Sequence, residues 1–130
     1  MEKEEIDIPH IILEWSEWVE WNELKINARQ SKEVRMPPGV PGVYEAKYVE
    51  IETAELLTIG KASDLRMRVK QGLVKGKTPH SAGDKIRAGE DTSRIIVRWA
   101  VTERPSAVEE ELHKRYQAKF KKMPKYVSHT

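Results

Sequence analysis

"LLTIGKASDLRMRVKQG", residues 56–72, joins the end of an apolar segment to a strongly basic one. The apolar part and its glycine predict a strand, ELLTIG, that ends at residue 60. Ser63 or Asp64 can cap a helix that runs from there to about residue 71. Leu65 and Val69 lie one turn apart and predict its buried side. The segment therefore indicates a strand followed directly by a helix that carries positive charge.

The rest of the chain predicts two more strands and a long helix. GVYEAKYVE (42–50) and SRIIVRWAVTE (93–103) alternate as strands do, and PSAVEEELHKRYQAKF (105–120) has an apolar residue every fourth position. KGKTPHSAGD (75–84) is typical of a loop. Because the first two strands are close enough to form a hairpin, we expect an α+β domain with a small, three-stranded, mostly antiparallel sheet flanked by helices.

The N-terminal segment is rich in tryptophan. Ile11, Ile12, Trp15, Trp18 and Val19 have a spacing compatible with a helix within residues 11–30, and Ser16 is a possible cap. The tryptophans are expected to cover part of the core, with base stacking as the alternative. MPPGVPG (36–42) breaks the chain, so residues 1–36 are predicted to form an N-terminal helical extension.

Composition excludes several classes of protein. The 130-residue chain is long enough for one domain with its own core, and 34% of its residues are charged. No apolar run is long enough to predict a membrane span or a membrane partner, and the acidic start MEKEEIDIPH does not resemble a secretory signal. The sequence contains no cysteine, which excludes disulfides and thiol chemistry. An intracellular, cytoplasmic protein is expected.

Positive charge is concentrated in two segments. Residues 61–87 carry eight basic and two acidic side chains, and residues 112–130 carry six basic and none acidic, although the net charge is only +2. Such clusters are typical of surfaces that bind polyanions, but also of solvated lysine-rich faces. The expected phosphate contacts are Lys61, Arg66, Lys70, Lys75 and Lys77.

The glycine and lysine pattern does not form a nucleotide-binding loop. GLVKGKT (72–78) has three residues between its glycines, whereas a Walker A loop needs four to wrap the phosphates. GKAS (60–63) follows a strand, but Glu55 stands where the earlier glycine would be. We therefore reject nucleotide hydrolysis.

Glu109 lies on the apolar side of the last predicted helix. It falls within the arc defined by Val108, Leu112, Tyr116 and Phe120, where a carboxylate needs a partner. Two interpretations remain open. Ser106 and Glu109 form the S-x-x-E pattern of a capping box, or Glu109 binds a divalent cation.

These features together resemble the GIY-YIG nuclease domain. GVY (42–44), TIG (58–60), an arginine eight residues after Gly60 and a glutamate in a helix beyond the third strand occur in that family's order. The resemblance covers about residues 37–127, leaving 128–130 as a tail. Helix geometry does not choose between Arg66 and Arg68, whereas the family spacing selects Arg68. The resemblance implies a DNA endonuclease that hydrolyses phosphodiester bonds with one Mg²⁺ or Mn²⁺.

The resemblance also implies roles for individual residues. Tyr44 would activate or orient the attacking water, Arg68 would stabilise the charge on the phosphate, and Glu109 would hold the metal. Lys61 would contact the phosphate or lower the pKa of Tyr44, because a tyrosine with its ordinary pKa of about 10 is a poor base. Each of these residues also has a structural interpretation: a packed aromatic, a surface ion pair, a capping glutamate and a turn lysine.

The chain departs from the family pattern at three positions. Thr58 replaces the second motif tyrosine, Gly72 stands four residues after the arginine, where His or Tyr is common, and Val127 occupies the position of an asparagine. His80, in the predicted loop, is a candidate for the missing base or phosphate contact.

Three functions are compatible with these observations. The first is a metal-dependent endonuclease, and the second is a non-cleaving module that binds nucleic acid on the same scaffold. The third is a protein-interaction domain that uses the tryptophan-rich segment. Residues 1–36 are short and acidic and do not resemble a DNA-reading segment. Either DNA cleavage is structure-directed or weakly specific, or a partner protein or a homodimer supplies target specificity.

Overall fold

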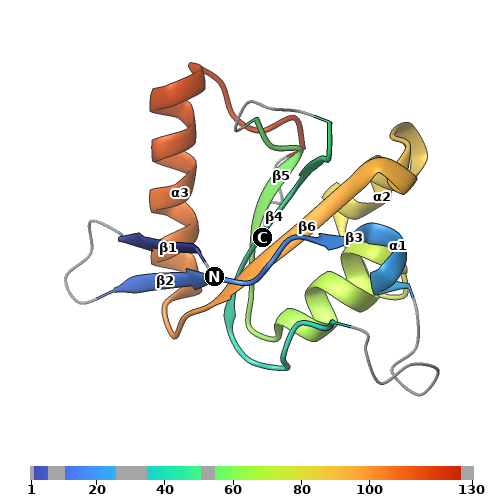
Figure 1. Cartoon of the computed structure of the whole chain (residues 1–130), viewed down its shortest axis with the longest axis horizontal. Coiled ribbons are helices and arrows are strands. Elements are labelled where there is room, and N and C mark those ends of the chain that lie inside the picture. Colours follow the sequence, from blue (N-terminus) through green and yellow to red (C-terminus); the bar gives the residue numbers. More distant parts are fainter. Residues whose placement is uncertain (1, 6–10, 26–34, 51–54, 127–130) are drawn as a thin grey trace.

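The protein has an α+β fold built on an antiparallel sheet of six strands (Figure 1). The structure is a computed structural model that describes residues 2–5, 11–25, 35–50 and 55–126. The strand order is β1-β2-β6-β4-β5, with the two-residue strand β3 also paired to β6. In the part of the chain that the structure describes, no helix has the length and apolar character needed to cross a membrane.

The predicted three-stranded unit is present. β4 (Gly42–Tyr48) lies between β5 (Thr58–Ala62) and β6 (Ile95–Val101), and both pairings are antiparallel. β5 begins three residues later than ELLTIG suggested. Residues 51–54, which would form the turn of the expected hairpin, lie outside the described residues. Tyr44 pairs with Gly60 on one side and with Trp99 on the other, so it occupies the middle of this unit.

The predicted N-terminal helical extension is wrong. The segment forms β1 (Glu2–Glu5), β2 (Ile12–Trp15), β3 (Val19–Glu20) and only a single helical turn, α1 (Trp21–Leu24). In β2, exposed and buried residues alternate, the period of a strand rather than of a helix. The free edge of β6 explains this outcome, since β2 and β3 satisfy backbone groups that β4 leaves unpaired on that side.

Ser16 is not a helix cap. It lies between β2 and β3, and both of its hydrogen bonds to β6 go to Trp99: its backbone N–H donates to the Trp99 carbonyl at 2.8 Å, and its hydroxyl accepts the Trp99 N–H at 3.0 Å. Trp15, Trp21 and Trp99 are each at most 7% exposed. Trp15 and Trp21 of the N-terminal segment therefore belong to the core, as the first interpretation expected, whereas Trp18 is only partly buried.

Each face of the sheet is covered by a different set of helices. One face, which includes Tyr44 and Ala46, packs against α1, η1 (Arg66–Val74) and α2 (Ser81–Gly89). The other face, which includes Val43, packs against α3 (Pro105–Phe120). Figure 1 shows α3 and the η1–α2 pair on opposite sides of the sheet. The predicted apolar stripe of α3 is confirmed, because three of its members are buried and Phe120 packs against them.

The predicted basic helix forms, but in an uncommon geometry. The side chain of Asp64 accepts the Met67 N–H at 3.0 Å, as the capping pattern suggested, and Leu65 and Val69 are buried. From Arg66 to Val74 the helix is a π-helix, a form often found at functional sites. The predicted loop KGKTPHSAGD is partly wrong, because α2 begins within it at Ser81, and the short turn η2 (Thr92–Arg94) then leads into β6.

A half-buried carboxylate links the C-terminal segment to the sheet. Glu90, just after α2, accepts hydrogen bonds from Lys125 at 2.6 Å, from Tyr126 at 2.6 Å and from Tyr48 of β4. These donors stabilise the charged form and lower the pKa of Glu90 from 4.5 to about 2, Lys125 having the largest effect.

We predict that Glu90→Gln weakens folding in a pH-dependent way. Because the pKa of Glu90 is lower in the folded state, its contribution is fully present above about pH 4.5 and is lost as the pH falls toward 2. Urea unfolding between pH 2 and 7 should show a stability gap between wild type and variant that closes over this window. Glu110→Gln, at an exposed site on α3, is the control and should follow wild type. A gap that stays constant with pH would contradict the prediction.

Candidate active site

Tyr44 is positioned by a close approach between two strands. Its ring crosses the neighbouring strand β5 at Gly60, where a methyl group would overlap its Cζ and hydroxyl atoms. Only glycine leaves room for this crossing, which takes the phenol over β5 toward the edge of the sheet. Tyr44 is fully buried.

The phenol of Tyr44 is hydrogen-bonded to His80, which caps α2. The Tyr44 hydroxyl lies 2.7 Å from His80 Nε2, and His80 Nδ1 accepts the Gly83 N–H at 2.9 Å. A neutral imidazole whose Nδ1 accepts a hydrogen bond carries its hydrogen on Nε2. Nε2 therefore donates to the Tyr44 oxygen, and the phenol is left to donate its own hydrogen elsewhere.

Burial keeps His80 neutral. The side chain is 2% exposed, and burial, followed by the positive charge of Arg68, lowers the pKa of His80 from 6.5 to about 4. At neutral pH His80 is thus a hydrogen-bond donor to Tyr44 rather than a cation. This role differs from the base or phosphate contact that the sequence suggested.

Gly72 provides the space that His80 occupies. A Cβ atom at Gly72 would lie 2.9 Å from Thr78 Oγ1 and 3.3 Å from His80 Cδ2. Gly72, which stands where His or Tyr is common in the GIY-YIG pattern, therefore lies beside His80, the candidate for the missing base. The His80 imidazole comes from the start of α2, whereas Gly72 lies in η1.

Lys61 and Arg68 line an open cavity of about 470 Å³ beside this pair. Lys61 Nζ donates to Ser106 Oγ at 3.1 Å, and Arg68 Nη1 donates to the Pro79 carbonyl at 3.4 Å. Asp64 contributes one carboxylate to the lining. The cavity is large enough for a phosphate group, and its two cations are suited to bind one.

Glu109 reaches the outer edge of β5 and does not form a capping box. α3 begins at Pro105 and its cap position is Arg104, so Ser106 lies inside the helix and its hydroxyl interacts with Lys61 instead. The Lys61 backbone N–H donates to the Glu109 carboxylate. Among the described residues, Glu109 Oε2 is buried without a hydrogen-bond partner.

The charge of Glu109 is poorly stabilised. Burial raises the pKa of Glu109 above its usual 4.5, although the positive charges of Lys61 and Arg68, and His113, act in the opposite direction. The carboxylate is thus close enough to both cavity cations to interact with them. Lys61 and Arg68 are site residues that the sequence predicted, whereas His113 is not.

A metal ion would have few protein ligands here. In the described parts of the chain, no group of three or more His, Asp or Glu side chains is arranged to hold one. Mg²⁺ commonly binds through one or two carboxylates and completes its shell with water and substrate phosphate. The buried, unpartnered Oε2 of Glu109 fits this mode of binding.

The remaining predicted residues that the structure describes do not line the cavity. Arg66 is exposed and donates to Met36 Sδ at 3.3 Å. Lys70 is 2% exposed, so it does not belong to an accessible basic surface. Lys75 and Lys77 are at least partly exposed on the segment between η1 and α2. Thr58 is buried, and Val127 is outside the described residues.

Sequence reasoning missed two members of the site. Ser106, which binds Lys61, was assigned to a cap, and His113 Nε2, 3.2 Å from the Ile59 carbonyl, was not considered. His113 lies four residues after Glu109, on the same side of α3, and this spacing was the available signal.

No protein-family model, no curated protein and no solved structure matches this chain. The resemblance to GIY-YIG nucleases therefore depends on the residues themselves and on their arrangement.

We predict that Gly60→Ala is strongly destabilising. The added methyl group overlaps the buried Tyr44 ring, and overpacking of this kind costs about 1–3 kcal/mol. Gly89→Ala is the matched control, because its Cβ would meet only the Tyr126 hydroxyl, at 3.4 Å, and alanine favours the helix. Denaturant unfolding should separate the two variants. Equal stability would show that the Tyr44 ring can move aside without cost.

We also predict that His80 stays neutral down to about pH 4. Its Cε1–H resonance, assigned by its disappearance in His80→Gln, should titrate with a midpoint near 4, and ¹⁵N shifts should show the Nε2–H tautomer. Since the unfolded chain binds this proton near pH 6.5, stability should fall as the pH drops from 6.5 to 4. A midpoint near 6.5 would disprove the buried, donating imidazole.

Proposed function

We propose that this protein is a metal-dependent DNA endonuclease of the GIY-YIG type. One observation carries the proposal: the five side chains selected from the sequence come from five different elements, β4, β5, η1, the start of α2 and α3, and gather at one edge of the sheet. Tyr44 bonds to His80, the charge of Arg68 acts on His80, and the charges of Arg68 and Lys61 act on Glu109. Perturbed titratable groups clustered beside a cavity are typical of active sites.

The cavity cations would bind the scissile phosphate. Lys61 and Arg68 face the same 470 Å³ space, so a DNA strand laid over it would place a phosphate between them. Arg68 would stabilise the negative charge that develops on the phosphate oxygens during hydrolysis. Lys75 and Lys77 would contact the DNA backbone next to the site.

Tyr44 would orient the attacking water and, in its phenolate form, accept the proton of that water and become a neutral phenol. His80 donates to the Tyr44 oxygen and would stabilise the phenolate before the proton transfer. Because Tyr44 is fully buried, the segment that carries Thr78 and Pro79 must move when DNA and water enter. Glu109 would hold the Mg²⁺ or Mn²⁺, which supplies Lewis-acid stabilisation of the phosphate.

The burial of Tyr44 and His80 also favours a second candidate, a nucleic-acid-binding module that does not cleave. Both side chains are at most 2% exposed and neither lines the cavity, whose charged lining residues are Lys61, Arg68 and Asp64. In that case Lys61 and Arg68 would bind phosphate, and the Tyr44–His80 pair would be part of the core.

A plasmid-nicking assay tests the proposal. With Mg²⁺ or Mn²⁺, the wild type should convert supercoiled DNA to the nicked form, and EDTA should stop the reaction. Arg68→Ala and Glu109→Gln should each lower the rate about 100-fold or more, because each removes an interaction with the transition state. Arg66→Ala and Glu110→Gln are the matched controls: each is adjacent to the site in sequence, is exposed and should keep the wild-type rate.

The two candidates predict different results. If the wild type and both site variants show the same trace nicking, the endonuclease is disproved. Salt-dependent DNA binding that weakens in Lys61→Gln, with a salt slope lower by about 1, would then establish the binding module. Thermal melts of each variant show whether a lost activity reflects a lost fold.

A further inference from the structure

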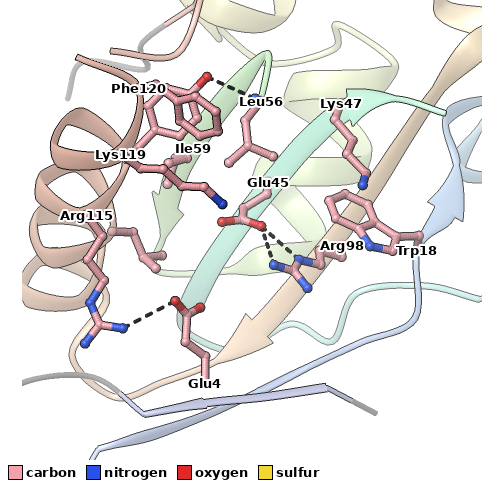
Figure 2. Close-up of a pocket in the computed structure, with 12 residues that line it drawn as sticks. Glu4, Trp18, Glu45, Lys47, Leu56, Ile59, Arg98, Arg115, Lys119 and Phe120 are labelled. Carbon is pink, nitrogen blue, oxygen red and sulfur yellow. Dashed lines mark hydrogen bonds and ion pairs between the residues drawn. The ribbon is translucent and has the colours of Figure 1, made fainter. Parts of the chain in front are cut away.

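A second pocket lies on the opposite face of the sheet, against α3 (Figure 2). Its volume is about 280 Å³, just below the range of about 300–1,000 Å³ usual for small-molecule sites. Leu56, Ile59 and Leu112 give it an apolar part, and Figure 2 shows Trp18 and Phe120 on opposite sides of it. The space suits one flat ring rather than a folded peptide.

The floor of this pocket is a buried ion pair. Arg98 Nε and Nη2 each lie 2.8 Å from Glu45 Oε1, and the two side chains are only 12% and 6% exposed. The guanidinium also stacks over Trp15 at 4.2 Å and over Trp18 at 4.7 Å. These contacts fix both groups, so the floor presents a carboxylate and a flat cation without needing to rearrange.

The rim carries an excess of positive charge. The pocket is lined by two carboxylates and four cations, of which Arg98 pairs with Glu45 and Arg115 pairs with Glu4. No ion pair of Lys47 or Lys119 is found among the described residues. Lys47 Nζ lies 4.7 Å from the Trp18 ring, so this amine stays next to the aromatic wall.

We propose that this pocket binds one nucleotide unit, with its base inside and its phosphate at the rim. The base would lie between the aromatic walls, which commonly stack bases, with one edge toward the Glu45–Arg98 pair. An amino or imino N–H of the base would donate to Glu45, since a carboxylate accepts several donors. Lys47 and Lys119 would bind the phosphate. The ligand is a free nucleotide or one unit of a single strand.

Simpler anions fit the pocket less well. Inorganic phosphate would leave the apolar walls uncovered, and a carboxylate or phosphate placed deep in the pocket would meet the negative charge of Glu45. A purely apolar ligand would leave the lysines unused. A molecule with an anion at one end and N–H donors on a flat ring at the other satisfies both ends. Nucleotide binding at this pocket does not require the proposed endonuclease activity, because none of the proposed catalytic residues lines it.

NMR titration of the full chain tests the proposal. The probes are guanosine monophosphate, guanosine, inorganic phosphate and a 5′-phosphorylated single-stranded octanucleotide of mixed sequence. Guanosine monophosphate should shift the indole N–H signal of Trp18, assigned through Trp18→Phe, in a saturable way. Guanosine and phosphate should each bind at least about tenfold more weakly. If the octanucleotide binds more tightly than guanosine monophosphate at the same signal, the ligand is one unit of a single strand. If it does not bind there, the ligand is a free nucleotide.

The lysines provide the matched variants. Lys47→Gln combined with Lys119→Gln should weaken binding of guanosine monophosphate about tenfold, because two phosphate contacts are lost. Lys114→Gln, also on α3 but outside the pocket, should bind like wild type. Glu109→Gln should also bind like wild type, which separates this site from the proposed nuclease site. Absence of a saturable shift at Trp18, or equal binding by the double lysine variant, overturns the proposal.

Discussion

The passage of the Tyr44 ring across Gly60 is the contact on which the candidate active site depends. A side chain at position 60 would push the phenol back toward the middle of the sheet. With glycine at position 60, the Tyr44 hydroxyl can extend from the inner strand β4 across the edge strand β5 and reach His80 at the start of α2. The hydrogen bond to His80 then requires a second glycine, Gly72, to leave room for the imidazole. The two glycines, Gly60 and Gly72, thus determine where Tyr44 and His80 meet.

α3 completes the same edge from the other face. β5 is the last strand of the sheet, so its outward backbone groups need partners other than a strand. His113 interacts with the Ile59 carbonyl, and Glu109 accepts the Lys61 N–H. The helix therefore protects an exposed edge with polar side chains, and this places a carboxylate next to the cavity that holds Arg68. Edge protection and site assembly result from one packing arrangement.

The sequence predicted the parts of the fold where local pattern and tertiary environment agree. β4, β6, the basic helix and α3 all have a clear period and clear ends, and α3 forms over the predicted residues. The N-terminal helix prediction was wrong because the spacing of Ile12, Trp15 and Val19 fits a helix, whereas in β2 Ile12 is exposed and Leu13 and Trp15 form the buried face. Only the open edge of β6 decides between helix and strand, and that edge is not visible in a short window of sequence.

The candidate site also contains some features that the sequence predicts and others that it does not. Family spacing selects Tyr44, Arg68 and Glu109, whose roles remain a proposal; the structure bonds Tyr44 to His80 and brings the charge of Arg68 to bear on His80 and Glu109. The capping role of His80 was missed since histidine is not a usual cap, so α2 had no recognisable start. The burial of Lys70 depends on contacts with Met36, far away in sequence, which charge counting does not detect.

The charge of Glu109 needs an explanation beyond the fold. A glutamine could accept the same hydrogen bond from the Lys61 N–H. Burying a glutamine costs less free energy than burying a carboxylate, because its amide is uncharged. One carboxylate oxygen remains buried without a partner among the described residues, and the pKa of Glu109 is raised. Lys61 and Arg68 compensate for this only in part. A small domain gains no stability from such a group; under the proposed function, this carboxylate would bind the metal ion that accompanies the phosphate.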